Sequence, residues 1–131
     1  MPTSLPDAGK RVVDAPNFAT VATVGPNGTP QLSVVWITRE GDDLLYSTVR
    51  GRQKVRNLER DARTTVLIHP QDAPYSYLEV RGVAEVADDN GRGLIHELAK
   101  EYTGKDRFEG DPPDAQRVIV RVRPHKVIWR G

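Results

Sequence analysis

The sequence predicts a mainly β, α+β protein: a six-stranded antiparallel β-barrel with two to three short helices. Several segments alternate β-branched or apolar residues with polar ones, which is the period-two pattern of half-buried strands. Short Gly- and Asp-containing turns separate the first of these segments, and such turns predict hairpins. A chain of 131 residues with 37% hydrophobic content suits a single domain, residues 1–131, with one core.

The strand pattern occurs in six segments: 18–25, 30–40, 44–48, 64–69, 76–87 and 117–131. In the second segment Leu32, Val34 and Trp36 share one face. The opposite face mixes polar and apolar side chains, as the wall of a pocket would: Gln31, Ser33, Val35 and Ile37. We therefore expect the first three segments to form a meander of which one strand borders a pocket.

Two later strands carry additional signals. Gly82 interrupts the segment 76–87 and predicts a bend or bulge, and Glu79 and Arg81 on one face predict an ion pair. The last segment pairs inward and outward residues in alternation. Val118, Val120 and Val122 are expected inside, and Arg117, Arg121 and Arg123 outside.

Helical spacing appears in three places. Residues 5–15, within an N-terminal arm of residues 1–16, favour a short helix that turns Val12 and Val13 inward. Val55, Leu58 and Ala62 follow helical spacing in a segment that begins near Arg52. A third helix of about three turns has an apolar stripe of Leu94, Ile95, Leu98 and Tyr102. Residues 103–116 read as a polar, mobile loop.

Composition excludes several classes of function. The absence of cysteine excludes disulfides and thiol chemistry, and no apolar run is long enough for a membrane span. The N-terminus lacks the apolar core of a signal peptide, which predicts a cytoplasmic location. A net charge of +1 disfavours a nucleic-acid binder. The three histidines are too scattered to predict a metal site.

Positive charge gathers in one segment, S-T-V-R-G-R-Q-K-V-R-N-L-E-R-D-A-R, residues 47–63. This segment could be a solvated helix face, a nucleic-acid patch or a site for an anionic small molecule. A helix that begins near Arg52 directs free N–H groups toward the loop 47–52, and Gly51 allows close approach. Aromatic residues are not interleaved with the basic ones, so we favour the anion site over nucleic acid.

Three stretches in order resemble a known family: G-T-P-Q-L-S-V-V-W-I at 28–37, the segment 47–68, and Y-S-Y-L-E-V-R-G-V-A-E-V at 75–86. From about Asn17 to the C-terminus the chain resembles the pyridoxamine 5'-phosphate oxidase-like split barrels. It is most similar to the branch that uses the deazaflavin coenzyme F420. The resemblance implies the FMN-binding split-barrel fold and a homodimer with two equivalent cofactor sites at the subunit interface.

The resemblance also implies a set of cofactor-binding residues. One strand would run beside the ring system: Gln31, Leu32, Ser33 and Val34. Ser47 and Thr48 would meet the ribityl or phosphate end of the cofactor. Arg52 and Lys54 would hold the phosphate, with a hydrogen bond from Asn57. Arg50 and Arg56 would lie near an anionic tail, and the other subunit would contribute Tyr75 and Tyr77.

By the same resemblance, the activity would be hydride transfer between F420 and an unidentified conjugated small molecule. The cofactor performs the difficult step in such enzymes, and no Ser-His-Asp set is found, so the catalytic residues stay unassigned. Two alternatives remain: an FMN-binding oxidoreductase of the same fold, or a non-enzymatic protein that binds F420 or a tetrapyrrole. Tyr77 could donate a proton or pack on a ring, and His125 and Trp129 could line the pocket or belong to the core.

Overall fold

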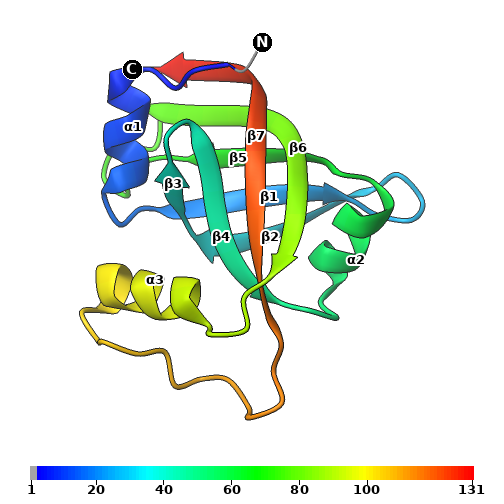
Figure 1. Cartoon of the computed structure of the whole chain (residues 1–131). Coiled ribbons are helices and arrows are strands. Elements are labelled where there is room, and N and C mark those ends of the chain that lie inside the picture. Colours follow the sequence, from blue (N-terminus) through cyan, green and yellow to red (C-terminus); the bar gives the residue numbers. More distant parts are fainter. Residues whose placement is uncertain (1–2) are drawn as a thin grey trace.

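The computed structural model describes residues 3–131, which form one antiparallel sheet and three helices (Figure 1). The strands are β1 (Phe18–Val24), β2 (Pro30–Trp36), β3 (Thr38–Glu40), β4 (Asp43–Val49), β5 (Arg63–Ile68), β6 (Tyr77–Asp88) and β7 (Arg117–Arg130). The helices are α1 (Asp7–Asp14), α2 (Gln53–Arg60) and α3 (Gly93–Thr103). The predicted mainly β class is confirmed, with seven strands where the sequence predicts six.

The sheet has the order β2-β1-β5-β6-β7-β4-β3 and curls so that its two edge strands follow each other in the chain (Figure 1). The predicted strand 30–40 is broken at Ile37 into β2 and β3, and this break accounts for the extra strand. Tyr102 on α3 bonds the backbone at this break: its hydroxyl accepts the Ile37 N–H at 2.9 Å and donates to the Asn17 carbonyl at 2.6 Å. The backbone of Ile37 is therefore bonded to a helix.

The barrel interior is filled from the predicted inward faces. Val118, Val120 and Val122 of β7 are fully buried, as expected. On the strand before the break, Val35 and Ile37 point into the core, whereas Leu32 and Val34 are 63% and 66% exposed. The face of β2 that carries the larger apolar residues therefore lies outside the barrel.

Gly82 marks the predicted bulge. The β6–β7 register shifts between Arg81 and Gly82, and a Cβ at position 82 would overlap the carbonyl oxygen of Arg123. No side chain fits there, so glycine is required for close strand approach. The predicted ion pair beside the bulge is also present, with Arg81 Nε 2.7 Å from a Glu79 carboxylate oxygen.

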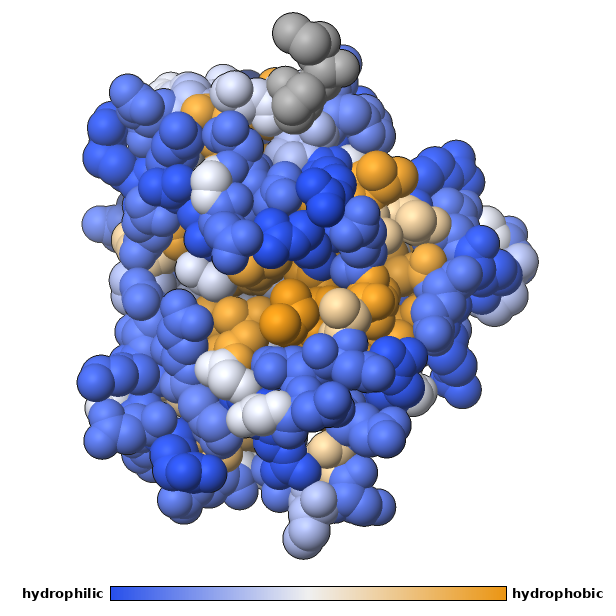
Figure 2. Space-filling view, viewed as in Figure 1, coloured by the Kyte–Doolittle hydropathy of each residue, from blue (hydrophilic) through white to orange (hydrophobic). Residues whose placement is uncertain are grey.

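The helices sit at the margins of the barrel (Figure 1). α1 buries Val12 and Val13, as predicted. α2 ends at Arg60, so the placement of Ala62 in this helix is wrong: the carbonyl of Ala62 accepts the Ala84 N–H of β6 instead. α3 joins the barrel through a second apolar cluster of Leu45, Leu94 and Leu98. Figure 2 shows apolar surface over the strands directly above α3. No helix within residues 3–131 has the length and apolarity to cross a membrane.

Candidate functional site

A cavity of about 270 Å³ opens at the end of the barrel nearest α3 and the start of α2. Six elements and the loop before β7 line it: Phe18, Val34, Val35, Trp36, Ser47, Thr48, Arg52, Lys54, Ile95, Leu98, Phe108 and Arg117. Five of the predicted site residues are in this set, namely Val34, Ser47, Thr48, Arg52 and Lys54. Residues from separate predicted elements thus meet at one cavity, which combines an apolar wall with a cationic one.

Lys54 is the most unusual cation of this wall. It is 9% exposed although it lies in the first turn of a helix. Burial, followed by the nearby charges of Arg52 and Arg117, lowers the pKa of the Lys54 ammonium. Within residues 3–131 no carboxylate forms an ion pair with Lys54 or Arg52. A buried cation without such a partner is costly unless a ligand supplies the opposite charge.

The backbone at the start of α2 adds further donors. Gly51 has a positive φ of 99°, which turns the chain into the helix, and Arg52 is the N-cap without a side-chain capping bond. The Val55 and Arg56 N–H groups return to the Arg52 carbonyl. The N–H groups of Gln53 and Lys54 have no acceptor in the described part of the chain. These free donors and the helix dipole favour an anion beside the two side-chain cations.

Ser47 provides an independent sign of a missing partner. Its hydroxyl is buried and unbonded within residues 3–131, and it faces the same cavity. A buried hydroxyl is normally hydrogen-bonded. Ser33 on β2 has a similarly unbonded hydroxyl but does not line the cavity. The residues present therefore fit a ligand that carries phosphate oxygens and hydroxyls at one end and an apolar ring at the other.

An aromatic cluster that sequence reasoning missed contributes Phe18, Trp36 and Phe108 to the other wall, with Tyr102 behind them. Trp36 and Tyr102 stack at 5.5 Å between ring centroids, Phe18 lies 6.0 Å from Tyr102, and Phe108 meets Trp36 edge-on at 6.0 Å. The four rings come from β1, β2, α3 and the following loop. The available signal was that Tyr102 falls on the apolar stripe of a helix, but nothing in the sequence indicated its partners.

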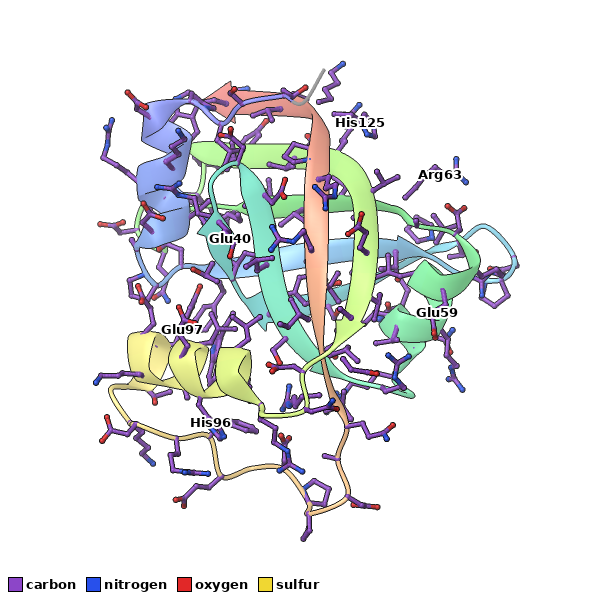
Figure 3. All side chains as sticks on the ribbon, in the orientation of Figure 1. Glu40, Glu59, Arg63, His96, Glu97 and His125 are labelled. Atoms are coloured by element: carbon purple, nitrogen blue, oxygen red, sulfur yellow. The ribbon has the colours of Figure 1, made fainter. Side chains whose placement is uncertain are left out.

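The loop 104–116 is held at several points, which is more contact than the sequence suggested for a mobile loop. The Phe108 N–H donates to His96 Nδ1 at 2.9 Å, and His96 points from α3 toward this loop (Figure 3). Arg92 donates to the carbonyls of Pro113 and Ala115. Asp111 pairs with Arg117, and both side chains are almost fully buried.

The outward placement of Arg117 predicted from strand alternation is wrong. The residue is 9% exposed and lines the cavity, because it stands at the first position of β7, where the strand meets the loop. The bidentate bond to Arg117 lowers the pKa of the Asp111 carboxyl. Arg121 is partly exposed and pairs with Glu40 and Asp43 outside the cavity.

Several predicted site residues lie elsewhere in this chain. Asn57 is fully buried and donates to the Thr23 hydroxyl, so it holds α2 against β1. Arg50 pairs with Asp88 and Glu59. Gln31 accepts a hydrogen bond from Thr23 at the far end of β2. None of these three side chains lines the cavity.

The remaining predicted residues lie on the outer surface. Leu32 and Tyr75 are 63% and 83% exposed, and Tyr77 is half-buried. The resemblance assigned Leu32 to the strand beside the cofactor ring, and Tyr75 and Tyr77 to the contribution of the other subunit. His125, at the end of the barrel remote from α3 (Figure 3), and Trp129, which packs against the core, do not line the cavity either.

Comparisons with known proteins agree with this geometry. The sequence model of the pyridoxamine 5'-phosphate oxidase family matches residues 5–129. A solved structure described as an F420 reductase is 32% identical, with a TM-score of 0.82, over 95% of this chain and 98% of that one. A conserved hypothetical protein from Mycobacterium tuberculosis is 24% identical with a TM-score of 0.77, over 96% of this chain and 85% of that one.

General Stress Protein 26 from Bacillus anthracis is more distant, at 18% identity and a TM-score of 0.71 over 93% of this chain and 90% of that one. At such identities the last two likenesses show the fold alone. Together with the F420 reductase they confirm the expected split-barrel fold.

Proposed function

The chain belongs to the pyridoxamine 5'-phosphate oxidase family, and on that premise we propose that it is an F420-dependent oxidoreductase that acts on a conjugated small molecule. One observation carries the proposal: Ser47, Thr48, Arg52 and Lys54 line one cavity together with an apolar, aromatic wall. The 32% identity to an F420 reductase over nearly the whole of both chains supports the deazaflavin as the cofactor.

Different residues of the cavity would bind different parts of the cofactor. Arg52, Lys54 and the free N–H groups of α2 would bind the phosphate by charge-assisted hydrogen bonds. The Ser47 and Thr48 hydroxyls would bond the adjoining ribityl or phosphate oxygens. Val34, Trp36 and Phe18 would pack beside the ring and keep water from it. When bound there, a deazaflavin supplies hydride transfer at the carbon that replaces flavin N5.

The proposal includes a homodimer in the cytoplasm. The cavity of one chain is open, and β2 exposes Leu32 and Val34 beside it. A second copy that covers this outer face would complete the site, with Tyr75 and Tyr77 of one chain facing the cavity of the other.

Titration of the purified protein with oxidised F420, followed by coenzyme fluorescence, tests the proposal. We expect binding at micromolar concentration or tighter. Arg52→Ala and Lys54→Ala should each weaken it by roughly 1–3 kcal/mol, because each removes a charged hydrogen bond. Arg63→Ala is the matched control, since Arg63 bonds Asp61 and does not line the cavity. Absence of binding to the unaltered protein would overturn the proposal.

One observation favours FMN as a second candidate cofactor. The deazaflavin carries a longer anionic tail, for which Arg50 and Arg56 were the expected contacts. Arg50 is instead paired with two carboxylates, and Arg56 bonds Gln53 on the exposed side of α2. The cations left in the cavity suffice for a terminal phosphate. A yellow preparation with FMN absorbance, and tighter binding of FMN than of F420, would establish the alternative.

A further inference from the structure

The guanidinium of Arg117 is held by a salt bridge and by an aromatic ring, and it also borders the cavity. Its Nε and Nη2 donate to the two oxygens of Asp111 at 2.8 and 2.7 Å. The Phe108 ring lies against the guanidinium, with 5.1 Å between Cζ and the ring centroid. Both charged side chains are less than 10% exposed, at 8% and 7%, and Arg117 borders the cavity. One edge and one face of the guanidinium are thus fixed from the loop 104–116.

This arrangement orients the guanidinium without using all of its donors. Arginine has five N–H groups, and Asp111 takes one from Nε and one from Nη2. No hydrogen bond from Nη1 is found within residues 3–131. A cation that is already immobilised loses little entropy when it binds a ligand, so its remaining donors bind more strongly than those of a free surface arginine.

The charges around the cavity also favour an additional anion. Arg117 lies close enough to Lys54 to contribute to the lowered pKa of that lysine, and Arg52 adds a third positive charge. Among the residues that the structure describes, Asp111 is the one carboxylate paired with any of these three cations. Positive charge is therefore in excess, and a phosphate group would relieve the mutual repulsion.

We propose that Arg117 is a third cation of the anion site and binds the phosphorylated end of the coenzyme together with Arg52 and Lys54, while Asp111 and Phe108 hold its guanidinium in place. The inference rests on the proposed function and deepens it, since it makes recognition of phosphate depend on β7 and the loop 104–116 as well as on α2.

A comparison of paired ligands tests this role. F420 is paired with the same chromophore lacking its phosphodiester tail, and FMN is paired with riboflavin. The ratio of dissociation constants within a pair measures recognition of the phosphate end. Arg117→Gln should lower this preference about tenfold or more, since it removes a charged donor. If Arg117 merely anchors the loop, both members of a pair should weaken equally and the ratio should stay constant.

The double variant Asp111→Asn with Arg117→Gln guards against misfolding, because it removes both charges of this buried pair and leaves neither one without its partner; it should show the same loss of preference. Arg121→Gln is the matched control: it removes another carboxylate-bonded arginine of β7 that lies outside the cavity, and its ratio should match the unaltered protein. An unchanged ratio in the Arg117 variants would overturn this inference alone. Failure of the unaltered protein to bind either phosphorylated ligand would overturn the proposed function, and this inference with it.

Discussion

Lys54 is the residue at which stability and binding oppose each other. The residue is 9% exposed and borders the cavity, without a carboxylate partner among residues 3–131 and next to Arg52 and Arg117. Such a cation destabilises the ligand-free fold and is useful only when an anion occupies the cavity. The destabilisation caused by Lys54 therefore indicates that the ligand of this cavity is an anion.

Lys54→Met should raise the free energy of unfolding of the ligand-free protein, measured by urea denaturation. The reason is linkage: because the folded pKa lies below the usual 10.5, the unfolded chain holds the proton more tightly between the two values. The stability of the unaltered protein relative to the variant should therefore rise with pH in that window. Below the folded pKa the destabilisation caused by the charged Lys54 is complete, so the free energies of unfolding of the two proteins should differ most there. A variant less stable at neutral pH would contradict this account.

The hydroxyl of one residue, Tyr102, holds the backbone at the break between β2 and β3. Tyr102→Phe would leave the buried Ile37 N–H without its acceptor. We expect a loss of about 1–3 kcal/mol of stability in urea. Tyr75→Phe is the control, since Tyr75 is 83% exposed, and it should change stability little. Equal effects of the two substitutions would show that the hydroxyl of Tyr102 is not structural.

Elements whose signals are local could be predicted from the sequence. The strand β5, the inward valines of β7, the apolar stripe of α3 and the bulge at Gly82 depend on neighbouring residues, and each was correctly predicted. The break at Ile37 was not, because it depends on a side chain 65 positions away. The end of α2 was also missed, since Ala62 fits the helical spacing but bonds to β6.

In the candidate site, too, only the residues with local signals could be predicted from the sequence. The basic cluster with Gly51 could be recognised because its residues are adjacent in sequence, and Arg52 and Lys54 indeed border the cavity. The contributions of Phe108 and Arg117 could not, because they depend on how the loop 104–116 folds back onto α3 and β7. Strand alternation even pointed the wrong way for Arg117, which stands where the alternation begins.

Gly82→Ala tests the register of β6 against β7. The added Cβ would overlap the Arg123 carbonyl, which belongs to the backbone and cannot move without disturbing the sheet. We expect a loss of about 3 kcal/mol, at the upper end for overpacking, in thermal or urea unfolding. Gly91→Ala is the control, because an added Cβ there meets nothing within 4 Å. A neutral effect at position 82 would mean that the bulge is readily displaced.

At the scale of the molecule, one outer face of the barrel is apolar. Val34 on β2, Thr20 on β1 and Leu67 on β5 lie in register across three neighbouring strands, with Leu32 beside them. Leu32, Val34 and Leu67 are all exposed in the single chain, at 63%, 66% and 36%. Contiguous exposed apolar residues mark an interaction surface, and this one adjoins the cavity through Val34.

Leu67→Asp should dissociate the proposed homodimer, because it places a charge on this face without touching the cavity. Sedimentation velocity should show a dimer for the unaltered protein and a monomer for the variant. If the partner completes the site, coenzyme binding should weaken in step with dissociation and recover at high protein concentration. Glu97→Lys, on the exposed side of α3, should alter neither property. A monomeric variant that binds the coenzyme as tightly as the unaltered protein would show that each cavity functions alone.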